Sequence, residues 1–175
     1  MLLKFDKTTE LIRSGKLLHI AGTEELIKKL PSGHWIAGST EYFMAEGGGK
    51  ISDDLLFVTE FQSTNFSIKS YTANDIKNVA TDAYDNGFTI LIVPFNSAVH
   101  KEYAENASGF EDMFMKTIAG WVSGINLDKS GQTPITANGV LGETNTDKAV
   151  ALHVEIPEGK SASLNIINIF EQDKS

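Results

Sequence analysis

The sequence predicts a mixed α/β fold in which one helix-strand-helix-strand-hairpin unit occurs twice. The order of helix-like and strand-like segments in residues 5–71 recurs in residues 72–170. Each half contains an apolar strand with a tryptophan and a glycine, at 35–39 and at 118–124. Strand-helix-strand spacing requires parallel crossovers, whereas the strand pairs that follow are typical of antiparallel hairpins. These observations predict mixed β-sheets covered by helices, with a pseudo-twofold axis and a groove between the halves.

Length and composition favour one compact domain over residues 1–175. The absence of cysteine excludes disulfides, thiolate metal sites and thiol catalysis. Acidic residues spread along the chain give a formal charge of −8, which opposes binding to nucleic acid or to an anionic membrane. No segment approaches the roughly 18 apolar residues of a membrane-spanning helix and no signal peptide is recognisable, so we expect a cytoplasmic protein.

The first half begins with a predicted helix at 6–13, which Asp6 can cap and Gly15 can end. A second helix is expected at 24–30, because acidic residues come early, lysines come late and Pro31 follows. Strands are predicted at 17–20, 35–39, 53–61 and 66–71. The last two strands flank a short polar turn and therefore predict an antiparallel hairpin.

The second half begins with a predicted helix at 73–85, because Thr72 and Asp75 resemble a capping box and several apolar residues share one face. The apolar run at 88–95 is expected at the centre of a sheet. Residues 96–109 form a long connection of a kind that is often functional. A further helix is expected near 110–117, and strands are expected at 118–124, 136–141, 148–156 and 163–169. Both one continuous sheet and two sheets packed in a four-layer sandwich agree with this order.

The ends of the two glycine-containing strands form the candidate site. Gly38-Ser39-Thr40 ends one strand, where hydroxyls and amides can face a cleft and glycine allows a ligand to approach closely. Ser123-Gly124 ends the equivalent strand, so we expect the two ends to converge. Alternatively, the glycine permits a tight bend and the hydroxyls cap local backbone. The residues expected to bind a ligand are Gly38, Ser39, Thr40, Tyr42, His100, Trp121, Ser123 and Asn126.

Chemistry at Ser39 is the enzymatic alternative, with one of four scattered histidines as its base. The surrounding residues do not form the Gly-x-Ser-x-Gly elbow of a hydrolase, so no catalytic residue is assigned. His153 alternates with apolar neighbours in a strand and is expected to be a partly buried, hydrogen-bonded histidine. The histidine spacing matches no metal motif, and no metal or cofactor is expected. Residues 47–50 lack the spacing of a phosphate loop and predict a hairpin connection.

The glycine-serine strands also carry a family resemblance. Residues 35–40, with the apolar strand at 53–58, resemble the N-terminal part of FIST domains, which are bacterial sensory modules. Residues 118–124, with the Asn-Gly turn at 137–140, are similar to a later part of the same family. In this alignment Glu41 stands where the family has alanine. The resemblance implies a sensor of amino-acid-like or other small polar metabolites.

Three functions are therefore carried forward. The leading hypothesis is a sensory domain that binds a small polar metabolite and has no chemistry of its own, with its site between the strand ends at 38–42 and 120–126. The first alternative is a Ser39-dependent hydrolase. The second is an interaction module in which an outer strand near 163–169 pairs with another subunit. A homodimer is compatible with all three.

Overall fold

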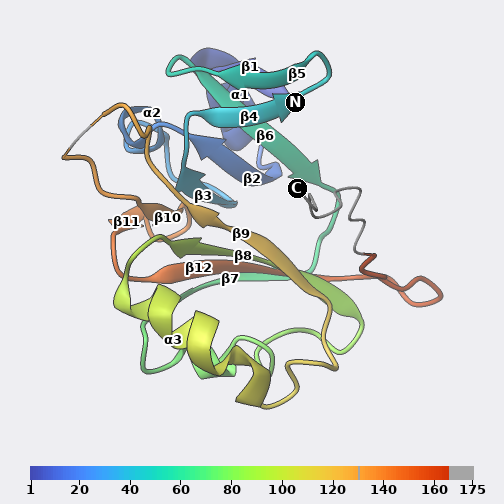
Figure 1. Ribbon diagram of the computed structural model, residues 1–175. Coiled ribbons are helices and arrows are strands. Elements are labelled where there is room, and N and C mark those ends of the chain that lie inside the picture. The colour runs from blue at the N-terminus through green and yellow to red at the C-terminus, as the bar shows by residue number, and fades with distance from the viewer. Residues whose placement is uncertain (130, 166–175) are drawn as a thin grey trace, which may run out of the picture.

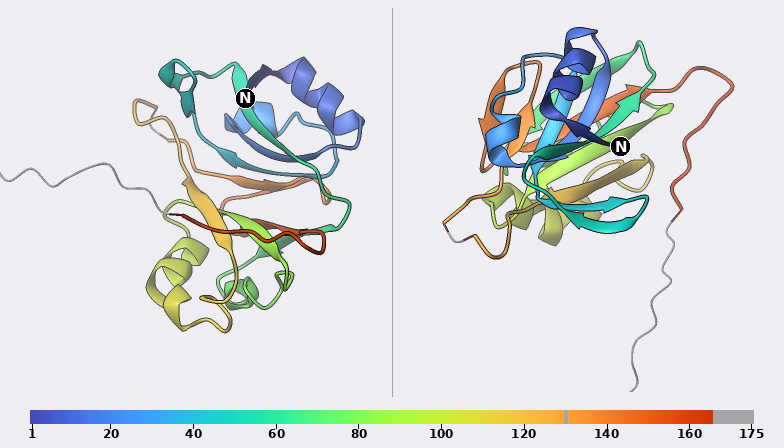
Figure 2. Two further views of the ribbon diagram at one scale, coloured as in Figure 1. Left: turned by 90° about the vertical axis from the view of Figure 1, so that its right-hand side faces the viewer. Right: turned by 90° about the horizontal axis from the view of Figure 1, so that it is seen from above.

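Two β-sheets packed face to face form the centre of the molecule, and helical segments cover their outer faces (Figure 1). The computed structural model describes residues 1–129 and 131–165. Between the sheets lies a layer of apolar side chains from both: Leu17, Ile36, Ile92, Val150, Leu152 and Val154. The arrangement is the four-layer sandwich, and the continuous sheet is excluded. Figure 2 shows the four layers from the side.

The first sheet has six strands in the spatial order β1-β6-β2-β3-β10-β11. Their bounds are β1 Leu2–Lys4, β2 Leu17–Gly22, β3 Trp35–Ser39, β6 Leu55–Phe61, β10 Thr136–Asn138 and β11 Glu143–Asn145. Helices α1 (Phe5–Arg13) and α2 (Glu24–Ile27) cover its outer face through Ile12 and Ile27. The hydroxyl of Thr23 caps α2 by accepting a hydrogen bond from the Leu26 amide at 3.3 Å.

The second sheet has four strands in the order β7-β12-β8-β9. Their bounds are β7 Phe66–Tyr71, β8 Gly87–Pro94, β9 Ile118–Ser123 and β12 Ala149–Glu155. Its outer face is covered by α3 (Ala98–Asn106) and by the 3-10 turn η1 (Ile76–Asn78), and a second such turn, η2 (Ala107–Gly109), follows α3. A separate hairpin of β4 (Tyr42–Ala45) and β5 (Gly48–Ile51) follows β3, as the glycine run predicts.

The four strands of the second sheet match four strands of the first, β1-β6-β2-β3, in connectivity and in direction. In the first, β1, β6 and β2 are antiparallel neighbours and β3 runs parallel to β2. In the second, β7, β12 and β8 are antiparallel neighbours and β9 runs parallel to β8. The prediction of mixed sheets covered by helices is therefore confirmed. Internal duplication stays a prediction, since this correspondence is one of topology.

The predicted hairpin of residues 53–61 and 66–71 is wrong. β6 pairs with β1 and β2, whereas β7 pairs with β12 in the other sheet, so residues 62–65 connect the two sheets instead of turning within one. The turn residues cannot distinguish a hairpin from a connection between sheets, because in both cases one strand precedes and one strand follows a short polar segment. The predicted partner of β12 at 163–169 lies mostly outside the described residues, and residues 163–165 are not in a strand.

Two predicted helices are also wrong. Residues 73–85 form η1 and a series of turns, although Asp75 Oδ1 accepts from the Thr72 amide as in a capping box. This segment is rich in Asn, Asp and Thr, whose side chains compete with helical hydrogen bonds. Residues 110–117 also form turns, and the helix of this region is α3, inside the expected loop at 96–109. Ser97 caps α3 by accepting from the His100 amide at 3.1 Å.

Gly38 lies at the closest approach of the two sheets. A Cβ atom on Gly38 would be 2.7 Å from Ile92 Cγ2 and 2.8 Å from the Trp121 ring. Such distances are shorter than any ordinary contact, so a side chain here would push the sheets apart. Close packing of the two sheets therefore requires glycine at this position, a reason that the sequence analysis did not anticipate.

We predict that Gly38→Ala lowers the free energy of unfolding by about 1–3 kcal/mol, because it overpacks a filled interface. Urea denaturation followed by circular dichroism measures the change. Gly124→Ala is the matched control, since a Cβ at Gly124 would meet nothing within 4 Å. Equal stability of the two variants would contradict the packing role.

His153, whose side chain is fully buried, links a series of side-chain hydrogen bonds between strands of the second sheet. The Tyr71 hydroxyl donates to Asp82 Oδ2 at 2.9 Å and therefore accepts from His153 Nε2 at 2.9 Å. His153 Nδ1 then accepts from the Thr89 hydroxyl at 2.8 Å. This arrangement requires the neutral imidazole, and burial lowers the pKa of His153 to about 4 despite the nearby Asp82 carboxylate.

We predict that His153 makes the fold less stable in mild acid. Because its pKa is depressed on folding, its contribution is complete above pH 6.5 and is lost as the pH falls toward 4. Between pH 7.5 and 5 this loss is about 2 kcal/mol. Urea titrations at both pH values should show a smaller loss for His153→Gln than for the wild type. The exposed His34 provides the control, and an H34Q variant should keep the wild-type dependence.

Candidate functional site

A polar cleft opens beside the end of β3, where the chain after β9 returns toward the first sheet. Its volume is about 190 Å³. Its lining comes from the start of α2, the end of β3 and the segment after β9: Thr23, Glu24, Glu25, Ser39, Thr40, Glu41, Asp53, Ile125, Asn126, Lys129, Gln132 and Thr133. This surface is more polar than apolar, so the cleft suits a small polar molecule.

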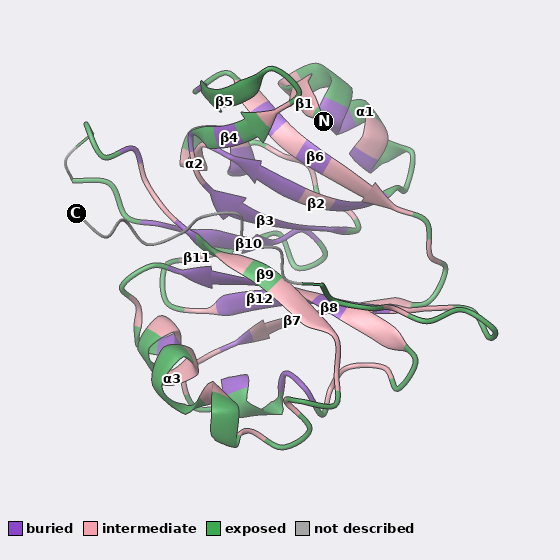
Figure 3. Cartoon of the chain, turned by 45° about the vertical axis from the view of Figure 1, so that its right-hand side comes forward, coloured by how far each residue is buried: buried purple, intermediate pink, exposed green. Residues whose placement is uncertain are grey.

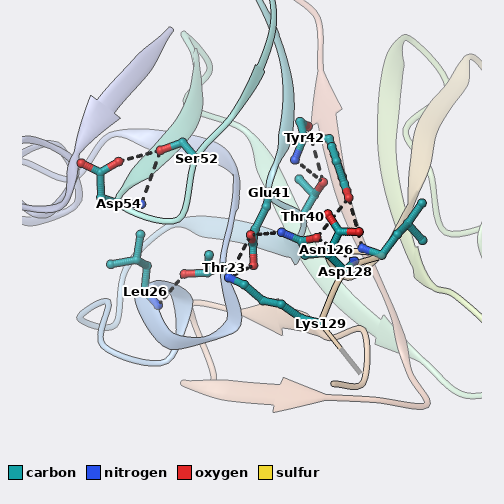
Figure 4. Close-up of polar contacts among 11 residues, drawn as sticks. Thr23, Leu26, Thr40, Glu41, Tyr42, Ser52, Asp54, Asn126, Asp128 and Lys129 are labelled. Atoms are coloured by element: carbon teal, nitrogen blue, oxygen red, sulfur yellow. Dashed lines mark hydrogen bonds and ion pairs between the residues drawn. The ribbon is translucent and has the colours of Figure 1, made fainter. Parts of the chain in front are cut away.

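The carboxylate of Glu41 is the central group of the cleft. Glu41 is 5% exposed, and both its oxygens accept from Lys129 Nζ, at 2.8 and 3.0 Å. Its Oε2 also accepts from Asn126 Nδ2 at 2.6 Å. Figure 4 shows both side chains reaching Glu41 from the segment after β9. Burial opposes ionisation, but these hydrogen bonds outweigh it and hold the pKa of Glu41 below its ordinary value.

Asn126 is fixed in place by a second set of contacts. Its Oδ1 accepts from the backbone amide of Asp128 at 3.0 Å and from the Tyr42 hydroxyl at 3.2 Å. The Tyr42 hydroxyl in turn accepts from the Leu127 amide at 3.1 Å. The amide group therefore presents its NH2 side to Glu41, as drawn in Figure 4.

The cleft has an excess of negative charge. Glu24, Glu25 and Asp53 line it together with Glu41, and Lys129 is the single basic side chain among its described lining residues. The hydrogen bond to Glu41 raises the pKa of Lys129, and the charges of Glu41, Asp53 and Glu25 act in the same direction. Lys129 is exposed and lies between β9 and β10, outside helices and strands.

Ser39 has a structural role at this cleft. Its hydroxyl donates to the Gly124 carbonyl at 2.8 Å and accepts from the Ile135 amide at 2.9 Å. The Gly124 amide also donates to the Ser39 carbonyl at 2.8 Å. Ser39 therefore ties β3 to both ends of the 124–135 segment. Within residues 1–129 and 131–165, no histidine is hydrogen-bonded to Ser39, so the structure gives the hydrolase alternative no base.

The expected convergence of the strand ends is present, and it brings part of the predicted site together. Ser39, Thr40 and Asn126 line the cleft, and Tyr42 supports Asn126 from outside its lining. The other predicted residues lie elsewhere: Gly38, His100, Trp121 and Ser123 are not among its lining residues.

Two of these residues fill the space between the sheets. Ser123 is fully buried, and its Cβ would be 3.1 Å from a Cβ at Gly38. Trp121 Nε1 donates to His19 Nε2 at 2.7 Å, which joins β9 to β2. Burial lowers the pKa of His19 to about 4, consistent with an imidazole that accepts a hydrogen bond. His100 lies on α3, where its Nδ1 accepts from the Asn96 amide at 3.1 Å.

The sequence analysis missed Glu41 and Lys129, the two residues that form the ion pair of the cleft. Eighty-eight positions separate them, and no local pattern links such distant charges. One local feature could have indicated Glu41: it directly follows the strand end Gly38-Ser39-Thr40, at a position where the FIST domains that this segment resembles have alanine. Among residues 1–129 and 131–165, no cluster of three or more His, Asp or Glu side chains is arranged to hold a metal ion.

The chain belongs to a family of unknown function (DUF6976), which it matches over residues 3–175. Comparisons with curated proteins and with solved structures found no match. In the described part of the chain, none of the helices combines the length and the apolar composition needed to span a membrane.

We predict that Lys129→Met raises the pKa of Glu41 above its ordinary value, because burial then acts without the ammonium group. An NMR titration of the Glu41 carboxyl carbon measures this pKa. Lys50→Met is the control, since Lys50 is exposed on β5 outside the cleft. An unchanged Glu41 titration in K129M would show that the ion pair does not form in solution.

Proposed function

We propose that this chain is a cytoplasmic sensory domain that binds a small polar metabolite carrying a positively charged group. The observation that carries the proposal is the buried Glu41 carboxylate, which is held ionised at the centre of a small polar cleft. Desolvating a carboxylate is costly unless a cation and hydrogen-bond donors compensate it. A bound ammonium or guanidinium group would supply that compensation.

Lys129 occupies the position that the ligand's cation would take. Its ammonium group contacts both oxygens of Glu41, and its side chain is 42% exposed. A ligand with its own ammonium group could displace Lys129 and keep Glu41 satisfied. Asn126 would remain as a neutral donor, while Glu25 and Asp53 at the rim would repel anions.

The position of Lys129 suggests how binding could be sensed. Lys129 belongs to the segment that leaves β9 in the second sheet and enters β10 in the first. Ser39 holds both ends of this segment, and Lys129 holds its middle. Displacing Lys129 would release the middle while the ends stay fixed, so binding would change one surface loop without disturbing the sheets. The resemblance to FIST sensory modules supports this role.

The size of the cleft limits the ligand. A volume of about 190 Å³ is below the range of roughly 300–1,000 Å³ that is typical for drug-sized ligands. Nucleotides and larger cofactors are therefore disfavoured, whereas small amines and amino-acid-like molecules are compatible. The structural role of Ser39 favours binding without chemistry.

We predict that the protein binds small ammonium compounds in preference to neutral molecules of similar size. Isothermal titration calorimetry with 1,4-diaminobutane, ethanolamine and glycerol would measure this preference. Glu41→Gln should weaken binding of the amines by about tenfold or more, since a charge-assisted hydrogen bond is worth about 1.5–3 kcal/mol.

Glu46→Gln is the charge-matched control, because Glu46 lies at the tip of the β4–β5 hairpin outside the cleft. Native mass spectrometry of the freshly purified protein would also reveal a retained ligand of unknown identity. Equal affinity of the wild type and E41Q for every amine, with no retained ligand, would contradict the proposal.

A further inference from the structure

The β4–β5 hairpin presents apolar side chains to solvent on one of its faces. In its antiparallel pairing Tyr42 lies opposite Ile51, and Met44 shares their face because side chains alternate along a strand. Met44 is 76% exposed, Ile51 is 63% exposed, and Tyr42 is also exposed. In Figure 3 the hairpin is largely green, the colour of exposed residues. Single exposed apolar residues are ordinary, but a group of them on one face indicates a contact surface.

Leu127 adjoins this face from the segment after β9. Its amide donates to the Tyr42 hydroxyl at 3.1 Å, and Leu127 itself is 87% exposed. Tyr42, Met44, Ile51 and Leu127 are called the hairpin face below. It therefore combines two parts of the chain that lie more than eighty positions apart.

The hairpin face has a packed base beneath it. On the opposite side of the hairpin Phe43 is buried and stacks on Phe57 of β6, with the ring centroids 6.5 Å apart. The Ser52 amide donates to the Glu41 carbonyl at 3.0 Å and closes the base of the hairpin. The hairpin cannot turn its apolar face inward without exposing Phe43, so the exposure of this face is a fixed property of the fold.

Exposed acidic residues flank the hairpin face along the chain. Glu46 lies at the turn between β4 and β5, Asp53 follows β5, and Asp128 follows Leu127. In the described part of the chain, none of these three acidic residues forms an ion pair. Their negative charges are therefore available to a partner.

The nearby lysines do not offset this charge. Lys129 pairs with Glu41, and Lys50 lies opposite Phe43 and therefore on the other side of the hairpin. An apolar surface in acidic surroundings is complementary to a partner that combines apolar and basic side chains. The same charges oppose a second copy of this chain, whose formal charge is −8, and an anionic membrane.

We propose that the hairpin face binds an amphipathic helix of a partner protein, with apolar side chains on one side of the helix and lysine or arginine beside them. Apolar anchors one helical turn apart would contact the hairpin face, and the basic side chains would meet Glu46 and Asp128. The four residues of the hairpin face lie outside the lining of the cleft, so this inference goes beyond the proposed function.

Two synthetic peptides of about 14 residues, or about four helical turns, test the chemistry of the partner. Both carry leucines on one helical face, and the other face carries lysines in the first peptide and glutamates in the second. We expect the full chain to bind the lysine peptide at least about tenfold more tightly than the glutamate peptide. In NMR spectra the lysine peptide should shift the backbone amides of the hairpin face.

Paired substitutions separate the apolar contribution from the acidic one. Met44→Ser with Ile51→Ser should weaken binding of the lysine peptide by at least about tenfold, because two apolar contacts are lost. Phe114→Ser is the matched control, since Phe114 is strongly exposed but precedes β9, at the end of that strand remote from the hairpin face. Glu46→Gln with Asp128→Asn should weaken binding and reduce its dependence on salt.

The outcomes decide between the possible occupants. Binding of the lysine peptide that is lost in the M44S/I51S variant and kept in F114S supports the proposal. Equal affinity for the two peptides, equal affinity of M44S/I51S and F114S, or no binding of either peptide would overturn it. Dimerisation that requires Met44 and Ile51 would assign the face to a second copy, and binding to phosphatidylcholine vesicles through them would assign it to a membrane. Either result would also overturn the proposal.

Discussion

Ser39 joins three parts of the chain through one buried hydroxyl, and the candidate site depends on this junction. It accepts from Ile135 and donates to Gly124, so the end of β3 is tied to the exit of β9 and the approach to β10. The absence of a side chain at Gly38 permits the two sheets to meet beside it. Without these contacts, the segment that carries Asn126 and Lys129 would have no fixed position relative to Glu41.

The chemistry of the cleft follows from one conflict. Glu41 is buried, which by itself favours the neutral acid, yet the surrounding donors favour the carboxylate and prevail. One donor, Asn126, is rigid because its own oxygen is fully engaged. The other, Lys129, is exposed and attached to a loop. A fixed neutral donor beside an exchangeable cation is an arrangement suited to reversible binding of a charged molecule.

Much of the fold could be predicted from the sequence, because strand position and burial leave local signals. The glycine-serine strand ends predicted the junction at Ser39 and Gly124, and the apolar run at 88–95 predicted a central strand. Strand partners could not be predicted. Whether residues 62–65 turn back or cross to another sheet depends on distant surfaces, as does the pairing of Glu41 with Lys129. Such contacts are decided by tertiary packing, which local propensity does not record.

β10 has a consequence for how the protein is made. It pairs with β3, so Ala37 lies opposite Ala137, one hundred residues later in the chain. During synthesis the ribosome releases the first strands long before this partner emerges. The first sheet therefore cannot be completed while the nascent chain is short. Until β10 is synthesised, the edge of β3 that pairs with it has no hydrogen-bonding partner from β10. Contacts so distant in sequence also slow folding after release, which makes this strand the point at which the growing chain most needs protection from aggregation.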